Sequence, residues 1–475
     1  CQDETRPFQS MRAFGSFAMS DQQSDLVILG GGSGGYACAL RAAELGLSVT
    51  LIEEAELGGT CLHRGCIPTK ALLHSAEVAD TARESETFGV KATLDGIDMS
   101  AVLAYKDGVV ARLYKGLQGL VKSRKVNLVS GTGALVSPNA VKVGDTTYRG
   151  TNVVLATGSY AKTIPGLEIG GRIMTSDQAL RYDEVPASAI VLGGGVIGVE
   201  FASIWRSFGV DVTIVEALPR LVAAEDAASS KVLERTFRKR GIAFHTGTKF
   251  ASATQDDSAV TVTLEDGKTL TADVLLVAVG RGPRTEGLGF AEAGVAMDRG
   301  FVLTDDRLNT NVAGVRAVRE IVTGLQLAHR GSAQVVFVAE DVAGLNPRTI
   351  EESGIPRVTY SDPEIASVGL NEDVAKAQYG DQVVSYEYNL GGNGKSQILM
   401  TTGFVKLVAL KDGPVVGVHM VGQRVGELIG EAQLIVNWQA EANDVASLIH
   451  AHPTQNEALG EAHLALAGKP LHAHA

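Results

Sequence analysis

The chain contains a strand, a glycine-rich turn and a helix twice over, and this repeated unit restricts its fold more than any other feature. The first copy has a continuous apolar run at 25–30, apolar residues at helical spacing over 36–45 and a second apolar run at 48–52. The second copy repeats this order, with apolar runs at 189–192 and 212–215 on either side of a helical segment. Continuous apolar strands that alternate with helices predict parallel sheets covered on both faces, and hence an α/β fold.

The glycines of the first turn have the spacing of a dinucleotide-binding site. Gly30, Gly32 and Gly35 lie between the strand and the helix, and Glu53 follows 23 residues after Gly30 at the end of the next strand. Such glycines permit a tight turn and a close approach of the backbone to a pyrophosphate at the helix N-terminus, while the carboxylate accepts hydrogen bonds from a ribose. An isolated motif of this kind also fits a structural turn, but the strand and helix around it favour nucleotide binding.

The second turn predicts a second nucleotide site with the same spacing. Gly193, Gly195 and Gly198 are followed by Glu216, again 23 residues after the first glycine. A carboxylate at this place repels a 2′-phosphate, so we expect NAD rather than NADP. Arg220 lies nearby and leaves two interpretations open, a solvent-exposed loop arginine or a contact to a phosphate.

Composition and charge exclude several kinds of partner. The formal net charge of -12 disfavours nucleic acid and anionic membranes, because binding to phosphates depends on clustered Lys and Arg. No apolar run reaches the roughly 18 residues of a membrane span. Four cysteines in 475 residues are too few for a disulfide-stapled secreted protein, so we expect a cytoplasmic protein. Residues 1–24 lack the apolar core of a signal peptide, and we expect a disordered extension there.

Two of the cysteines, Cys61 and Cys66, predict redox chemistry. On an ideal helix, cysteines five positions apart have Cα atoms roughly 8.6 Å apart, beyond the reach of a disulfide, so a bridge requires a distorted turn. Gly65 and Pro68 supply this distortion, and a strained, accessible disulfide is easily reduced. A helix that starts here favours the thiolate of Cys66. A structural disulfide or a metal site with His63 is less favoured, because two thiolates and one histidine make a poor zinc site.

Near the C-terminus, His452 precedes a proline, and Glu457 follows five residues later. The proline favours an extended backbone at the histidine, and a carboxylate at this spacing is placed to orient the imidazole, which together suit a general base. A His–Pro pair by itself is more often a loop feature.

Together these motifs resemble the pyridine nucleotide-disulfide oxidoreductase family. The resemblance rests on the run GGTCLHRGCIPTK from Gly58 to Lys70, on the two glycine turns and on Ala156-Thr157-Gly158, and it covers residues 25–475. It implies two Rossmann-like dinucleotide-binding domains, for FAD and NAD, and a C-terminal α+β dimerisation domain. The implied division is a FAD-binding domain at 25–165, an NAD-binding domain at 166–290, a returning segment of the FAD or central domain at 291–350 and the dimerisation domain at 351–475.

The resemblance also assigns residues to the sites. Cys61, Cys66, His452 and Glu457 are implied to be catalytic, without a metal. The implied FAD contacts are Gly30, Gly32, Gly35, Glu53, Thr60, Lys70, Gly133, Thr157, Gly158, Glu320 and Ala328. The implied NAD contacts are Gly193, Gly195, Gly198, Glu200, Glu216 and Gly280. Lys70 and Glu200 are also expected to form an ion pair beside the flavin.

Within this family, the residues between the cysteines and the C-terminal sequence resemble the actinobacterial members that oxidise dihydrolipoyl groups. The implied reaction passes electrons from a dithiol through Cys61 and Cys66 to FAD and then to NAD. His452 would deprotonate a dithiol held at the cysteine pair of the other subunit, which implies a homodimer. Lipoyl domains and the core of 2-oxoacid dehydrogenase complexes are the implied partners, and nucleic acid and membranes are not.

Several residues depart from the family's pattern around the flavin. Arg319 and Glu320 stand where the family has a Gly–Asp pair, Val335 where a small residue is usual and Arg316 where an aromatic one is common. These departures predict weakened FAD retention. Two other functions stay open: a mycothiol-type disulfide reductase, and a flavin-poor, non-catalytic NAD-binding or assembly subunit of the same fold.

Overall fold

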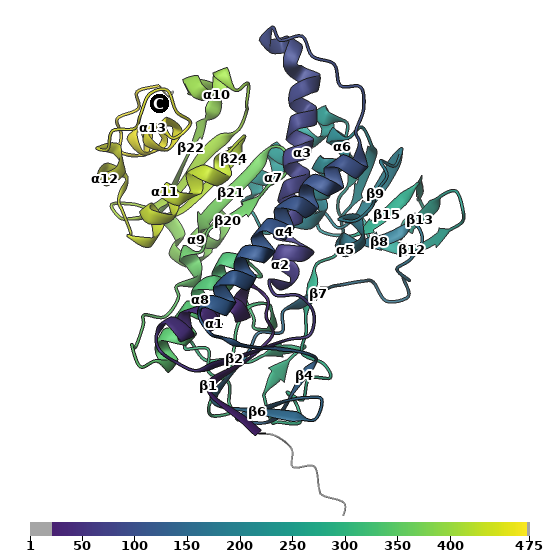
Figure 1. Cartoon of the computed structure of the whole chain (residues 1–475). Coiled ribbons are helices and arrows are strands. Elements are labelled where there is room, and N and C mark those ends of the chain that lie inside the picture. Colours follow the sequence, from purple (N-terminus) through teal and green to yellow (C-terminus); the bar gives the residue numbers. More distant parts are fainter. Residues whose placement is uncertain (1–20, 473–475) are drawn as a thin grey trace, which may run out of the picture.

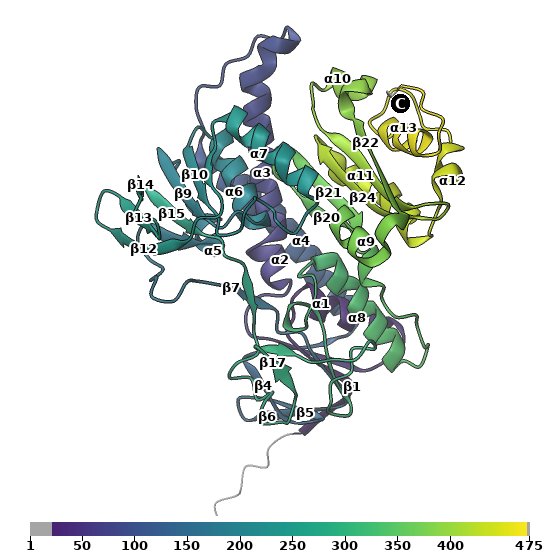
Figure 2. The ribbon, with the colours of Figure 1, turned by 180° about the vertical axis from the view of Figure 1, so that it is seen from behind.

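The computed structural model describes residues 21–472. These residues form three large sheets, each with its own helices (Figures 1 and 2). The first sheet lies at the bottom of Figure 1, the second at the upper right and the third at the upper left. The first two contain parallel strands that alternate with helices, and the third is antiparallel. The predicted fold class is therefore confirmed.

The first sheet carries the first glycine turn. Its strands are β1 (Asp21–Leu29), β2 (Val49–Glu53), β3 (Asn127–Ser130), β4 (Gly133–Ser137), β5 (Ala140–Val143), β6 (Thr146–Leu155) and β19 (Val315–Ala317). They lie in the order β3-β2-β1-β6-β5-β4, and β19 pairs with β6. The pairs among β1, β2, β3, β6 and β19 are parallel, whereas β4 and β5 form an antiparallel extension of β6.

The first strand begins earlier than the sequence predicts. Residues 21–24 pair in register with residues 147–150 of β6, so the predicted disordered extension is wrong for this stretch. Polar side chains are tolerated there because the strand is held by backbone pairing and not by an apolar face. The rest of the predicted extension, residues 1–20, lies outside the described residues.

Both faces of the first sheet are covered, which explains the continuous apolar run of β1. Leu26 and Ile28 pack with residues of α1 (Ser33–Glu44) and α8 (Ala328–Val342), whereas Val27 packs on the opposite face against Phe290 and Leu135. Complete burial of these strand residues anchors the end of β1, and the glycine turn follows directly.

The second sheet repeats this design around the second glycine turn. Its parallel strands β8 (Ile173–Thr175), β9 (Ser188–Leu192), β10 (Asp211–Val215), β11 (Ala243–His245) and β15 (Val274–Val277) lie in the order β11-β10-β9-β15-β8. A separate antiparallel sheet contains β12 (Phe250–Gln255), β13 (Val260–Leu264) and β14 (Thr269–Ala272). The associated helices are α5 (Ser176–Ala179), α6 (Val196–Ser207) and α7 (Ala227–Arg240).

Two long helices lie between β2 and β3 of the first sheet in the chain, and the first of them packs against helix α6 of the second sheet. After the short helix α2 (Gly59–His63), α3 (Cys66–Glu84) runs to η1 (Ser85–Phe88), and α4 (Met99–Ser123) returns beside α3. Leu72 and Ala76 of α3 belong to the same buried cluster as Val199 and Phe201 of α6. This packing fixes the start of α3 relative to the second sheet.

The third sheet is formed by the C-terminal part of the chain. Its strands β20 (Arg357–Thr359), β21 (Glu364–Gly369), β22 (Val383–Asn389), β23 (Phe404–Leu410) and β24 (Val415–Gly422) lie in the order β20-β21-β24-β23-β22. Its helices are η3 (Glu352–Gly354), α9 (Glu372–Tyr379), η4 (Gly380–Gln382), η5 (Leu390–Gly392), α10 (Gly394–Ile398), α11 (Val425–Asn437), α12 (Ala442–Ala446) and α13 (Glu457–Leu466). The core between this sheet and its helices includes Val405, Ala432 and Leu459.

Short elements join these parts. β7 (Ser159–Ala161) and β16 (Arg281–Pro283) pair where the chain passes between the first two sheets, and β17 (Met297–Asp298) pairs with β18 (Phe301–Val302). The turn η2 (Arg319–Ile321) follows β19. Among residues 21–472, no helix is long and apolar enough to cross a membrane.

Candidate functional site

The three glycines of the first turn have different structural reasons to be glycine. A Cβ on Gly30, whose φ is +105°, would clash with the carbonyl group of Ala156, and a Cβ on Gly35 would clash with the carbonyl group of Gly30. The atom nearest to a Cβ built on Gly32 would be the Cα of Gly59, at 4.0 Å, so this position is open. The outer glycines therefore permit the tight turn, and the middle one leaves space at the N-terminus of α1.

The second turn reproduces this arrangement. Gly193, with a φ of +110°, abuts the carbonyl group of Ala278, and Gly198 abuts the carbonyl group of Gly193. Nothing lies within 4 Å of a Cβ built on Gly195, the residue that precedes α6. Each turn thus has two packed glycines and one open glycine at a helix N-terminus.

The two predicted ribose-binding carboxylates are held in the same way. Glu53 Oε2 accepts from the backbone N–H of Gly31 at 2.6 Å, and Glu216 Oε2 accepts from that of Gly194 at 2.6 Å. The other carboxylate oxygens accept from the N–H groups of Ala55 and Leu218. Both carboxylates therefore lie beside their glycine turns, as the spacing predicts.

Arg220 points back into its own loop. Its Nη2 donates to the carbonyl oxygens of Ala223 at 2.9 Å and Glu225 at 3.1 Å. The guanidinium is therefore used to shape this loop, which favours the interpretation without a phosphate contact.

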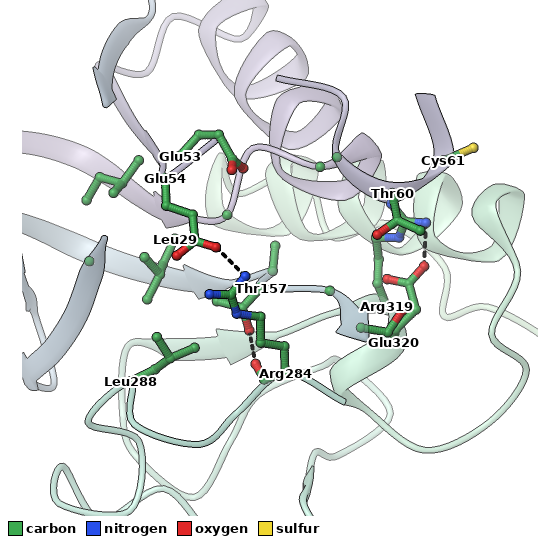
Figure 3. A pocket seen from close by; sticks show the side chains of 18 of the residues that line it. Leu29, Glu53, Glu54, Thr60, Cys61, Thr157, Arg284, Leu288, Arg319 and Glu320 are labelled. Atoms are coloured by element: carbon green, nitrogen blue, oxygen red, sulfur yellow. Dashed lines mark hydrogen bonds and ion pairs between the residues drawn. The ribbon is translucent and has the colours of Figure 1, made fainter. Parts of the chain in front are cut away.

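A cavity of about 750 Å³ extends from Glu53 at the first glycine turn to Cys61 (Figure 3). Of the predicted FAD contacts, eight line it: Gly30, Gly32, Glu53, Thr60, Gly133, Thr157, Gly158 and Glu320. Gly35 packs behind the turn, and Lys70 and Ala328 lie outside the lining. The cavity brings the predicted nucleotide and thiol sites together.

Three charged residues of the cavity wall carry no signal in the local sequence. Glu54 and Arg284 form an ion pair across the cavity, and the hydroxyl of Thr157 donates to the carbonyl oxygen of Arg284 (Figure 3). Arg64, between the cysteines, also lines the cavity. The ion pair joins segments 230 positions apart in the sequence, so no local pattern could mark it.

The cysteine motif is divided between two helices, as the distorted turn predicts. Cys61 lies on α2 and Cys66 is the first residue of α3, with Gly65 at the break between them. Pro68 is accommodated in the first turn of α3, where its missing N–H leaves no hydrogen bond unmade. Both cysteines are free thiols, and each shifts the acidity of the other.

The two thiols have opposite acidities. The hydrogen bond from Cys61, together with the charges of Lys70 and Arg319, outweighs burial and lowers the pKa of Cys66 to about 7. The same hydrogen bond, burial and the nearby Cys66 raise the pKa of Cys61. The position of Cys66 at a helix N-terminus also favours its thiolate. Cys66 is therefore the thiolate of the reduced pair.

The predicted ion pair between Lys70 and Glu200 is present. Lys70 Nζ lies 3.0 Å and 2.9 Å from the two carboxylate oxygens of Glu200, which is 3% exposed. The backbone N–H of Tyr360 also donates to Glu200 at 2.9 Å, and Lys70 Nζ lies 4.6 Å above the Tyr360 ring. Glu200 therefore holds the ammonium group of Lys70, which acts on Cys66.

His452 and Glu457 form the predicted pair at the start of α13. His452 Nδ1 lies 2.8 Å from Glu457 Oε1, and Glu457 Oε2 accepts from the N–H of Thr454 at 2.8 Å. The His452 side chain is 80% exposed, and α13 lies far from α2 in both views of the chain (Figures 1 and 2). One chain does not bring this pair to its own cysteines.

A second histidine pair near His452 was missed from the sequence. His450 Nε2 lies 2.8 Å from Glu431 of α11, and Asn456 donates to the other oxygen of the same carboxylate. Glu431 raises the pKa of His450. This network anchors the loop that presents His452.

Comparisons with known proteins agree with this geometry. Residues 24–334 match the family model described as pyridine nucleotide-disulphide oxidoreductase, and residues 355–463 match that of the family's dimerisation domain. A dihydrolipoyl dehydrogenase from Bacillus subtilis (strain 168) is 40% identical over 94% of this chain and 99% of its own length. The mitochondrial dihydrolipoyl dehydrogenase 1 of Arabidopsis thaliana is 39% identical over 98% of this chain and 94% of its own length. A crystal structure of LpdA from Mycobacterium tuberculosis superimposes with a TM-score of 0.87 at 27% identity, covering 94% of this chain and 99% of that one.

Proposed function

The chain belongs to the pyridine nucleotide-disulphide oxidoreductase family, and from this premise we propose that it is a dihydrolipoyl dehydrogenase. It oxidises a dihydrolipoyl dithiol through Cys61 and Cys66, with FAD as cofactor and NAD as electron acceptor. The observation that carries this proposal is the thiol pair at one end of the dinucleotide cavity, with Cys66 as its thiolate. Neither a mycothiol-type reductase nor a non-catalytic subunit is favoured by the relatives named above.

The residues around the cavity suit FAD over most of its length. The open face of Gly32 leaves room for a pyrophosphate at the N-terminus of α1, and Glu53 would accept from the adenosine ribose. Thr60 and Gly158 also line the cavity, and Thr60 lies on the side of Cys61 (Figure 3). When bound, FAD accepts an electron pair from the reduced cysteines and delivers it to NAD as hydride.

The cysteine disulfide is reduced and the substrate dithiol is oxidised in two thiol–disulfide exchange steps. A substrate thiolate attacks Sγ of Cys61 in the oxidised pair, so the Cys61–Cys66 bond breaks and Cys66 leaves as a thiolate. The second substrate thiolate then attacks the substrate sulfur of the mixed disulfide, which closes the substrate disulfide and releases Cys61. The pair has gained two electrons, and Lys70 and the N-terminus of α3 stabilise the charge on Cys66.

His452 is the base that removes protons from the substrate dithiol. Glu457 accepts from Nδ1 and thereby leaves Nε2 free to receive a proton. Because α13 lies far from α2 in one chain, His452 would serve the cysteines of a partner subunit in a homodimer. The match of residues 355–463 to a dimerisation domain supports this arrangement.

Glu216 would select NAD at the second glycine turn. Its carboxylate would accept from a ribose hydroxyl and repel a 2′-phosphate, and Arg220 is already bound to loop carbonyl groups. Lipoyl domains and the core of a 2-oxoacid dehydrogenase complex are the partners that this activity requires. A cytoplasmic location would keep the thiol pair able to cycle.

An absorbance spectrum with and without dihydrolipoamide tests the proposed activity. The FAD-loaded protein should keep an oxidised flavin and gain a long-wavelength absorbance, because the Cys66 thiolate would donate charge to the flavin beside it, and Cys66→Ser should abolish the new absorbance. Cys38→Ser is the control, because Cys38 is buried on α1 away from the motif. A flavin that NADH reduces and dihydrolipoamide leaves unchanged would exclude the proposed substrate.

A further inference from the structure

Arg319 has a backbone conformation that side chains rarely adopt. Its φ is +68°, in the left-handed region, yet the residue is only 8% exposed. The backbone N–H donates to Oε1 of Gln334 on α8 at 2.7 Å, which holds the turn η2 against that helix. The surrounding structure thus maintains a strained arginine at the wall of the dinucleotide cavity.

The Arg319 side chain lies in the gap between α1 and α8. A Cβ on Gly34 of α1 or on Gly331 of α8 would overlap the side chain of Arg319, so only these glycines leave room for it. Val335, a predicted departure, is fully buried nearby and lies 3.5 Å from a Cβ built on Gly34. The arginine is therefore closely enclosed by the two helices.

The guanidinium is only partly satisfied there. Nη1 donates to the hydroxyl of Ser33, the first residue of α1, and Nη2 donates to Glu320 Oε1 at 2.6 Å. Nε is buried and has no hydrogen-bond partner among the described residues. A cation beside the positive end of a helix is itself unfavourable, so Glu320 is the contact that compensates this charge.

Arg319 and Glu320 also stand in the path of an extended ligand. Figure 3 places them beneath Thr60, on the side of Cys61, whereas Glu53 and Glu54 mark the other end of the cavity. A dinucleotide that reaches from Glu53 to the thiols must pass this pair. Its pyrophosphate would meet the helix N-terminus that Arg319 now contacts and would be repelled by Glu320.

We propose that the Arg319–Glu320 pair is a displaceable plug in the dinucleotide cavity, which FAD must move in order to bind. This inference rests on the proposed function, because it takes FAD as the ligand. The Arg319 side chain fills the α1–α8 gap, and flavin affinity is set by the loss of its contact to Ser33 when the pair is displaced.

The test compares FAD binding to the full-length, flavin-stripped wild type and to Arg319→Gly. Glycine removes the plug and adopts the positive φ without strain, so we expect the dissociation constant for FAD to fall by about tenfold or more. The matched control is Arg299→Gly, which also replaces an arginine of positive φ (+47°) but lies exposed in the turn between β17 and β18. It should leave the dissociation constant unchanged.

A second measurement needs no flavin. Arg319 contributes to the low pKa of Cys66, so Arg319→Gly should shift the pH dependence of Cys66 alkylation upward in the flavin-stripped protein, and Arg299→Gly should not. An unchanged alkylation profile would show that Arg319 does not lie beside the thiols, and would overturn the proposal even if the flavin titration failed.

The outcomes of the titration separate the plug from the proposed function. Unchanged FAD binding by Arg319→Gly, with tight binding by the wild type, would overturn the plug alone. Weaker binding would also overturn the plug and would make Arg319 a contact for the pyrophosphate. Absence of FAD binding in every variant would overturn both the plug and the dehydrogenase. Tighter binding by Arg319→Gly without dihydrolipoamide oxidation would support the plug and contradict the proposed function.

Discussion

At the scale of single residues, the two cysteines show how a pair of identical side chains acquires different chemistry. Cys61 is the hydrogen-bond donor, and Cys66, at the first position of α3, is the acceptor. Lys70 is one turn further along the same helix and adds a positive charge near Cys66. The difference in acidity therefore follows from position along α2 and α3, not from the residue type.

We expect alkylation of Cys66 in the reduced, flavin-free protein to be half-maximal near pH 7. Its pKa is lowered to about 7, so the reactive thiolate is present above this pH and is lost below it. Because the hydrogen bond from Cys61 is the largest cause of the shift, Cys61→Ala should move the midpoint upward by about one pH unit. Iodoacetamide labelling followed by mass spectrometry measures the midpoint.

Cys61→Ser is the matched control, since a serine hydroxyl keeps a donor at this position and should move the midpoint less than alanine does. The experiment uses a Cys1→Ser background, and Cys38 stays unreactive because burial raises its pKa to about 12. A wild-type midpoint near the ordinary pKa of a cysteine, or equal midpoints for the alanine and serine variants, would contradict the proposed hydrogen bond.

At the scale of elements, the same strand–turn–helix unit is built twice. In each copy some glycines are required for packing of the turn, and another leaves space for a ligand. Gly198 of α6 abuts the carbonyl group of Gly193, whereas Gly195 faces open space. The same substitution at these two positions should therefore have different consequences, although the positions are less than one helical turn apart.

Gly198→Ala should destabilise the protein by about 2 kcal/mol, because its methyl group would overpack the turn. Gly195→Ala should change stability by no more than about 1 kcal/mol, because its backbone conformation suits alanine and its Cβ meets nothing. It should instead weaken NADH binding by about tenfold, since the methyl group would occupy the pyrophosphate space. Denaturant unfolding and NADH fluorescence titrations measure the two effects. Unchanged NADH binding by Gly195→Ala would place the coenzyme elsewhere.

Local sequence patterns predicted a structural element correctly where all the residues that determine it lie in one segment. The break at Gly65, the glycine turns and the strand of Phe404–Leu410 needed no information from distant residues. The start of β1 was missed because residues 21–24 carry no apolar pattern, and their place in the sheet depends on pairing with the distant strand β6. The position of the Arg319 side chain could not be predicted, because it depends on the gap between α1 and α8.

At the scale of the whole molecule, buried polar contacts hold the third sheet against the second. Lys406 of β23 lies 3.0 Å from Asp226 at the start of α7 and 2.7 Å from Glu372. The backbone N–H of Tyr360 donates to the carboxylate of Glu200 on α6. These contacts join residues up to 180 positions apart, which no sequence pattern marks, and they keep His452 away from the cysteines of its own chain.

Because His452 lies away from the cysteines of its own chain, we predict that two inactive variants can complement each other in a mixed dimer. Cys61→Ser and His452→Gln should each abolish dihydrolipoamide oxidation, but refolding or co-expressing them together should restore it. Random pairing makes about half of the dimers mixed, and each mixed dimer has one intact site of two, so about a quarter of the wild-type activity should return. The assay is NADH formation in the presence of added FAD. A mixed dimer isolated by two different affinity tags should show about half of the wild-type activity, because one of its two sites is intact.

The matched control mixes Cys61→Ser with Cys66→Ser, which leaves every site without an intact cysteine pair and should restore nothing. If the His452→Gln mixture stayed as inactive as this control, each His452 would have to serve the cysteines of its own chain. That result would require α13 to approach α2, which the contacts of Lys406 and Tyr360 prevent in the described arrangement. Restored activity, in contrast, would show that the reaction belongs to the dimer, because neither variant chain alone carries both the intact cysteine pair and the base.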